Sequence, residues 1–137
     1  MHGNLGQHET KITHLNSAGM QAMYGADIAD LYPDPAQKAA GEAKAETLLA
    51  LCGGQSLVAF AEPMDHDAAD VAAPKTYFIC LRDEVFPLPA QREMASLCGA
   101  QRVVELDAGH SPYLVGHHVE TIMREISTAA AVVTTAA

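Results

Sequence analysis

Two short apolar runs, separated by a helical pattern, organise the second half of the chain. Residues 75–81 (KTYFICL) are rich in β-branched and aromatic side chains, which is typical of a strand buried on both faces. Residues 102–106 (RVVEL) predict a second strand, and residues 89–98 predict a helix that Gly99 ends. Strand, helix and strand in this order favour a parallel pair in an α/β sheet.

Helical patterns account for most of the preceding stretch. Asp34 followed by Pro35 suits a helix start, as N-cap and first helical residue, and predicts a helix over residues 35–51. A shorter helix is expected at residues 56–60 (SLVAF), followed by an acidic, alanine-rich linker over residues 64–73.

The two ends of the chain carry weaker patterns. Residues 12–29 predict one or two short helices, because Gly19 and Gly25 interrupt any long one. A helix is expected from residue 117 or 118 to about 128, and the small-residue tail after it either extends that helix or frays. The apolar face of this helix is formed by Val119, Ile122, Met123 and Ile126.

Composition narrows the class of protein. The 137 residues suit a single domain at most, and 49% of them are apolar, although aromatic residues make up only 5%. A formal net charge of −9 argues against nucleic acid and anionic membranes as partners. Three cysteines without a CxxC pair indicate buried free thiols in a reducing compartment. Without a signal-peptide or membrane-spanning pattern, a cytoplasmic location is expected.

An acid and a histidine follow the two predicted strands. Asp83 comes immediately beyond the first predicted strand, and His110 lies in the short loop that follows the second, so both are expected at the carboxyl edge of the sheet. A carboxylate beside an imidazole can fix its tautomer for proton transfer. The alternative is a solvated Asp83 paired with Arg82 or Arg92, and Glu84 competes for the same role.

Other polar residues in the sequence suggest structural roles. Asp107 suits a turn, in which its side chain accepts backbone hydrogen bonds. His66 stands among three aspartates, at positions 65, 67 and 70, but without the spacing of a calcium loop. A solvated acidic linker is therefore expected there, and neither a metal nor a cofactor is predicted.

Two motifs resemble the α/β-hydrolase fold, specifically its small, single-domain, esterase and hydroxynitrile-lyase-like branch. In that branch a late strand reads roughly KTYI-C-xxD-xxxP followed by Q-xx-MA, and the histidine loop reads E-x-DAGHSP-[FY]-L. This chain has KTYFICLRDEVFP, QREMA and ELDAGHSPYL. The resemblance implies that Asp83 is the acid of a catalytic triad and His110 its general base.

The resemblance also implies an architecture. LY-x-D at residues 31–34 and LVAFAEP at residues 57–63 look like the helical cap of this branch. The implied fold class is α/β: the C-terminal portion of an α/β-hydrolase, with a helical cap followed by two parallel strands, flanking helices and an incomplete sheet. The implied divisions are an arm and start of the cap (1–30), the cap (31–73), the core portion (74–128) and a tail (129–137).

The implied activity is hydrolysis of a carboxylic ester by a Ser-His-Asp mechanism. The serine of this family lies in a G-x-S-x-G turn, and the chain has no such sequence, so it is expected to be inactive alone. Ser111 favours esterases, since the lyases carry lysine there. Substrate contacts are expected from Ser111, Tyr32 and Phe60.

The expected partners are a small ester substrate and either a second copy or a complementing N-terminal half. Two strands without neighbours would expose unpaired backbone edges, which favours such an association. A non-catalytic binding or assembly module, or a truncated remnant of such an enzyme, are the alternatives.

Overall fold

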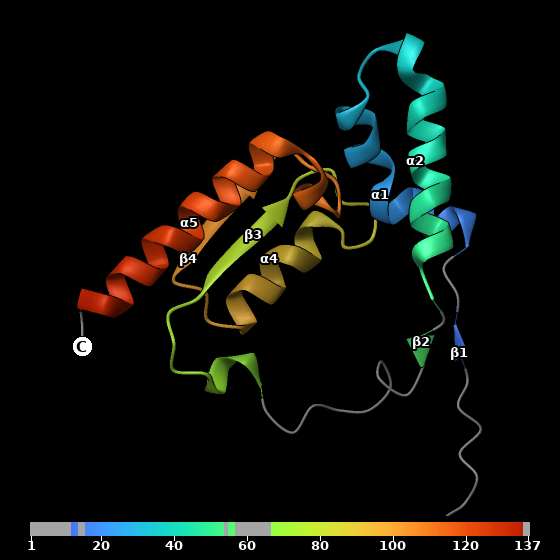
Figure 1. Ribbon diagram of the computed structural model, residues 1–137. Helices are drawn as coiled ribbons and strands as arrows, with labels where there is room; N and C mark the ends of the chain where they lie inside the picture. The colour runs from blue at the N-terminus through green and yellow to red at the C-terminus, as the bar shows by residue number, and fades with distance from the viewer. Residues whose placement is uncertain (1–11, 14–15, 54, 57–66, 136–137) are drawn as a thin grey trace, which may run out of the picture.

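A parallel pair of strands forms the centre of the molecule. The structure, a computed structural model, describes residues 12–13, 16–53, 55–56 and 67–135, with side chains for residues 16–53 and 67–131. Strands β3 (Thr76–Cys80) and β4 (Arg102–Leu106) pair in parallel, with Thr76 opposite Arg102 and Cys80 opposite Leu106. Helix α4 (Leu88–Leu97) connects them, and α5 (Gly116–Thr135) follows, so that the two helices flank the pair (Figure 1). The mixed α/β class predicted from the sequence is confirmed.

The core lies at the carboxyl-terminal half of this strand pair. In β3 only Ile79 and Cys80 are buried, and the three residues before them are half-buried, so the expectation of a strand buried on both faces is right for two residues only. On β4, Val103 stays 47% exposed. The other buried apolar residues of this region are Ala95, Leu106, Ala108 and Val115.

A pair of helices stands beside the carboxyl end of the strands (Figure 1). Helix α1 (Ser17–Leu31) packs on α2 (Lys38–Leu51), with the 3₁₀ turn η1 (Pro35–Gln37) between them. The predicted cap is present, since the Asp34 carboxylate accepts a hydrogen bond of 2.9 Å from the Ala36 amide. Gly41 is buried where the two helices meet, close to the side chains of Ile28 and Tyr32.

The first helix corrects the sequence-based prediction. Gly19 and Gly25 lie within the single 15-residue helix α1, and neither has a positive φ. The Asn16 side chain caps this helix by accepting a 2.9 Å hydrogen bond from the Gly19 amide. A helical glycine costs only about 1 kcal/mol relative to alanine, so packing against α2 and the core outweighs the two interruptions.

Two further segments depart from the predictions. Ser56 does not begin a helix: it lies in β2 (Gln55–Ser56), which pairs antiparallel with β1 (Ile12–Thr13). Residues 57–60, the remainder of that predicted helix, lie outside the described residues, as do residues 64–66 of the linker. The rest of the linker holds one 3₁₀ turn, η2 (Ala68–Asp70).

The last helix extends beyond Glu125, the last buried residue among its described side chains. Helix α5 extends into the small-residue tail and ends at Thr135. Of its predicted apolar face, Val119 and Ile122 are half-buried, while Met123 and Ile126 are 54% and 53% exposed. In the part of the chain that the structure describes, no helix is both long enough and apolar enough to cross a membrane.

Candidate active site

The loop after β3 presents Asp83 in a fixed orientation. The Asp83 amide donates a 3.3 Å hydrogen bond to the carbonyl of Cys80, which turns the chain at the end of the strand. Its Oδ1 atom accepts hydrogen bonds from the amides of Val85 (2.7 Å) and Phe86 (3.0 Å). An aspartate that binds its own backbone two residues on is a common turn-former, and here this leaves Oδ2 for another partner.

That partner is the imidazole of His110. The Nδ1 atom of His110 lies 2.9 Å from Oδ2 of Asp83. The Asp83 side chain is only 5% exposed and that of His110 is 22% exposed. A carboxylate can only accept, so in neutral His110 this contact places the proton on Nδ1 and leaves Nε2 as a base. The structure thus brings together the two residues that the sequence predicted as acid and base.

Gln91 holds the Asp83 loop from the inside. Its side-chain amide, 3% exposed, accepts from the Cys80 amide (2.8 Å) and donates to the carbonyls of Cys80 (2.9 Å) and Phe86 (2.7 Å). The ring of Phe86 in turn lies 5.6 Å from the imidazole of His110, centroid to centroid. Gln91 therefore joins the end of β3 to the loop that carries the acid.

The alternative ion pairs for Asp83 are not formed. Arg82 binds Asp30 of α1 and the carboxylate of Asp107, at 2.8 Å from its Nε atom, and these hydrogen bonds, that with Asp30 foremost, raise the pKa of Arg82. Arg92 pairs with Glu105 at 2.6 Å. The expectation that Asp107 accepts backbone hydrogen bonds is also wrong, because its side chain binds the Arg82 guanidinium instead.

A buried carboxylate that the sequence analysis missed lies behind the histidine loop. Asp27 of α1 is fully buried and accepts hydrogen bonds from the amides of Gly109 (2.9 Å) and Ser111 (2.8 Å). The only signal in the sequence is an acid between Ala26 and Ile28, on the apolar side of a helix. Charged residues are almost never fully buried unless they are paired, so that pattern does suggest a distant partner.

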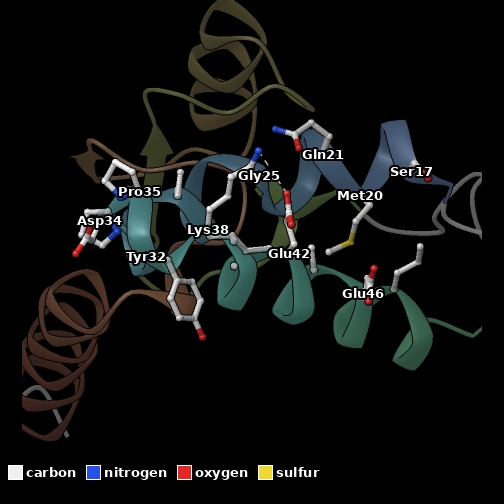
Figure 2. Close-up of a pocket in the computed structure, with 16 residues that line it drawn as sticks. Ser17, Met20, Gln21, Gly25, Tyr32, Asp34, Pro35, Lys38, Glu42 and Glu46 are labelled. Carbon is white, nitrogen blue, oxygen red and sulfur yellow. Dashed lines mark ion pairs between the residues drawn. The ribbon is translucent and has the colours of Figure 1, made fainter.

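The predicted substrate contacts divide among three places. Tyr32 lines a cavity of about 580 Å³ between α1 and α2 (Figure 2). Ser111 is fully buried and does not line that cavity, and Phe60 lies outside the described residues. The cavity contains neither Asp83 nor His110, so it is separate from the acid–base pair.

Nucleophile and metal candidates are few in the described residues. The hydroxyl of Ser111, beside His110, is buried without a hydrogen-bond partner. Cys80 is also buried, and desolvation, followed by the charge of Asp83, raises the pKa of its thiol to about 11, which keeps it protonated at neutral pH. No group of three metal-ligating side chains occurs in the described part of the chain, and His66 lies outside it.

Comparison with known proteins adds no relative. No protein-family model, no curated protein and no solved structure matches this chain.

Proposed function

We propose that Asp83 and His110 are the acid and general base of a Ser-His-Asp mechanism that hydrolyses carboxylic esters. The observation that supports this proposal is the 2.9 Å contact between Oδ2 of Asp83 and Nδ1 of His110, which leaves Nε2 as the basic nitrogen. The motifs around both residues, which resemble those of α/β-hydrolases, supply the ester as the substrate class.

In the proposed hydrolysis, His110 transfers protons and Asp83 stabilises the charge that His110 gains. When a serine hydroxyl attacks the ester carbonyl, Nε2 of His110 takes its proton, and the Asp83 carboxylate stabilises the imidazolium that forms. The imidazolium then protonates the leaving alcohol. Water attacks the acyl-serine in the second half of the reaction, again with His110 as base, and releases the carboxylic acid.

In this proposal the attacking serine is supplied by another polypeptide segment and not by residues 1–137. The sequence lacks the G-x-S-x-G turn, and the one serine next to His110 has a buried hydroxyl. The chain by itself is therefore expected to hydrolyse p-nitrophenyl acetate no faster than its His110→Gln variant. Hydrolysis that depends on His110 in the isolated chain would show that the nucleophile is already present.

The acid–base pair itself is tested by the tautomer of His110. Long-range ¹H–¹⁵N spectra at pH 8 should show the proton of neutral His110 on Nδ1. In Asp83→Asn, the side-chain oxygen is expected to keep the amides of Val85 and Phe86, so the NH₂ group faces Nδ1 and moves the imidazole proton to Nε2. A wild-type imidazole protonated on Nε2 would contradict the proposed base.

A second candidate function is a non-catalytic assembly module that uses the edge of β3. Backbone groups of a strand alternate in direction, and the Leu81 amide points to β4, so those of Thr76 and Phe78 point to the other edge. In the described part of the chain, β3 has β4 as its one neighbour. A strand from a second copy could pair there.

Sedimentation velocity tests this candidate. An assembly module should form dimers that the variant Thr76→Pro reduces, since proline at the first residue of a strand removes one outward donor and is tolerated there. A folded monomer at all concentrations would argue against it.

A further inference from the structure

We propose that Asp27 is a positioning residue that holds His110 in register with Asp83, an inference that rests on the proposed function. Its carboxylate binds the backbone on both sides of the histidine: Oδ1 accepts from the Gly109 amide at 2.9 Å and Oδ2 from the Ser111 amide at 2.8 Å. His110 lies between these two hydrogen-bonded amides. Asp27 thus fixes the backbone on both sides of His110, while Asp83 orients the imidazole ring.

Burial makes these two hydrogen bonds strong. Asp27 and Ser111 are fully buried, and Gly109 is buried as well, so water does not compete for the carboxylate. Hydrogen bonds to an ionised acceptor are roughly twice as strong as neutral ones. Both oxygens of Asp27 accept, which a carboxylate can do and a carboxamide cannot, because its NH₂ group would face an amide N–H.

The loop approaches α1 so closely that its sequence is restricted. A Cβ atom at position 109 would lie 2.5 Å from Oδ2 of Asp27 and 2.9 Å from the Cβ of Ala26. Only glycine at position 109, opposite a small residue at position 26, allows the amide to reach the carboxylate. This gives a physical reason for the glycine before the histidine.

A second contact of α1 offers a control that distinguishes the positioning of His110 from the attachment of the helix to the strands. Asp30, one turn further along α1, binds Arg82, which also binds the side chain and the carbonyl of Asp107. This contact attaches α1 to both strand ends without touching the residues beside His110. Loss of Asp30 should therefore loosen the helix but spare the imidazole, because Asp107 still binds Arg82 and keeps it from Asp83. Loss of Asp27 should affect both.

The experiment compares Asp27→Asn with the matched control Asp30→Asn by the same ¹H–¹⁵N spectra of His110. In Asp27→Asn the loop should shift and weaken the hydrogen bond from Nδ1 of His110 to the Asp83 carboxylate. The ratio of the Nδ1–H to the Nε2–H tautomer should then fall about tenfold, the effect of losing one hydrogen bond to a charged group. In Asp30→Asn the ratio should stay unchanged, even where thermal unfolding shows a similar loss of stability. An unchanged ratio in folded Asp27→Asn, or an equal fall in Asp30→Asn, would overturn the positioning role.

Two further variants keep the outcome interpretable. If Asp27→Asn does not fold, Gly109→Ala decides: it retains the carboxylate but pushes the loop away, so it should lower the ratio, and an unchanged ratio overturns the inference. Asp83→Asn tests the proposed function separately. If that variant leaves the tautomer unchanged, the acid–base pair fails; if it changes the tautomer and Asp27→Asn does not, only the positioning role fails.

Discussion

At the scale of single residues, the acid–base pair depends on side chains that are each committed to several partners. Asp83 uses one oxygen for the backbone of its own loop and the other for His110. Arg82, next in sequence, is occupied by Asp30 and Asp107. Because the guanidinium of this adjacent residue binds Asp30 and Asp107, it does not compete with the imidazole for the carboxylate of Asp83.

Cys80 supplies a prediction at this scale. Burial raises the pKa of its thiol from 9.0 to about 11. At pH 8 the thiolate fraction of the folded protein should thus be about a hundredfold lower than that of the unfolded chain. Iodoacetamide should alkylate Cys80 at least that much more slowly in buffer than in urea, as followed by mass spectrometry of the peptide. Equal rates would mean that the end of β3 is open to solvent.

At the scale of elements, the side chain of Gln91 connects α4 to the end of β3 by hydrogen bonds. Replacing Gln91 with leucine removes three hydrogen bonds. It leaves the Cys80 amide without its partner, and the Cys80 carbonyl keeps only the 3.3 Å hydrogen bond from the Asp83 amide. Buried polar groups left unpaired cost about 1–3 kcal/mol each, so the free energy of unfolding should fall by about 2–4 kcal/mol in urea titrations followed by circular dichroism. Arg92→Ala is the control: its ion pair with Glu105 is exposed, and its loss should cost about 0–1 kcal/mol.

Two glycines with opposite roles give a paired prediction for the helices. Gly41 lies within α2, and a Cβ there would meet Ile28 at an ordinary 3.5 Å, so Gly41→Ala should stabilise the protein by about 0.5–1 kcal/mol. Gly99 follows α4 with a φ of +68°. Gly99→Ala should destabilise the protein by about 1–2 kcal/mol, because a left-handed conformation is unfavourable for alanine. Melting temperatures that move in the same direction for both variants would contradict these assignments.

At the scale of the whole molecule, folding shifts the pKa values of several ionisable side chains. Arg102, at the start of β4, binds both oxygens of Glu125 on α5, and this hydrogen bonding lowers the pKa of Glu125 below its ordinary 4.5. Burial raises the pKa of Cys80 from 9.0 to about 11 and, with Tyr113 next in effect, that of Tyr24 from 10.0 to about 12. Each shift means that folding favours one protonation state.

These shifts predict a plateau of stability with two declining sides. The contribution of Glu125 is complete above about pH 4.5 and is lost as the pH falls through its lower folded-state pKa. Those of Cys80 and Tyr24 are complete below about pH 9 and 10, and are lost as the pH rises towards 11 and 12. Urea unfolding from pH 3 to 11 measures the profile. Glu125→Gln should flatten the acidic side, whereas Glu42→Gln, which alters an exposed pair with Lys38, should not.

The sequence by itself determined the local elements of the strand pair and the identity of the candidate acid and base. The β-branched run before Asp83, the short run before His110, the cap at Asp34 and the stop at Gly99 are signals that depend on a few neighbouring residues. They placed β4 at its observed bounds and α4 within one residue of its observed ends. Residue order alone also put Asp83 and His110 at one edge of a sheet.

The tertiary structure decided what depends on contacts between distant parts of the chain. Helix α1 continues through Gly19 and Gly25, and β3 is buried only at its end. Arg82 pairs with Asp30 and Asp107. These features follow from packing that no local sequence pattern encodes. Asp27 is the clearest case, since its partners lie 82 and 84 residues further along the chain. A buried carboxylate shows in the sequence only as an acid on an apolar face; which amides satisfy it is decided when the helix meets the histidine loop.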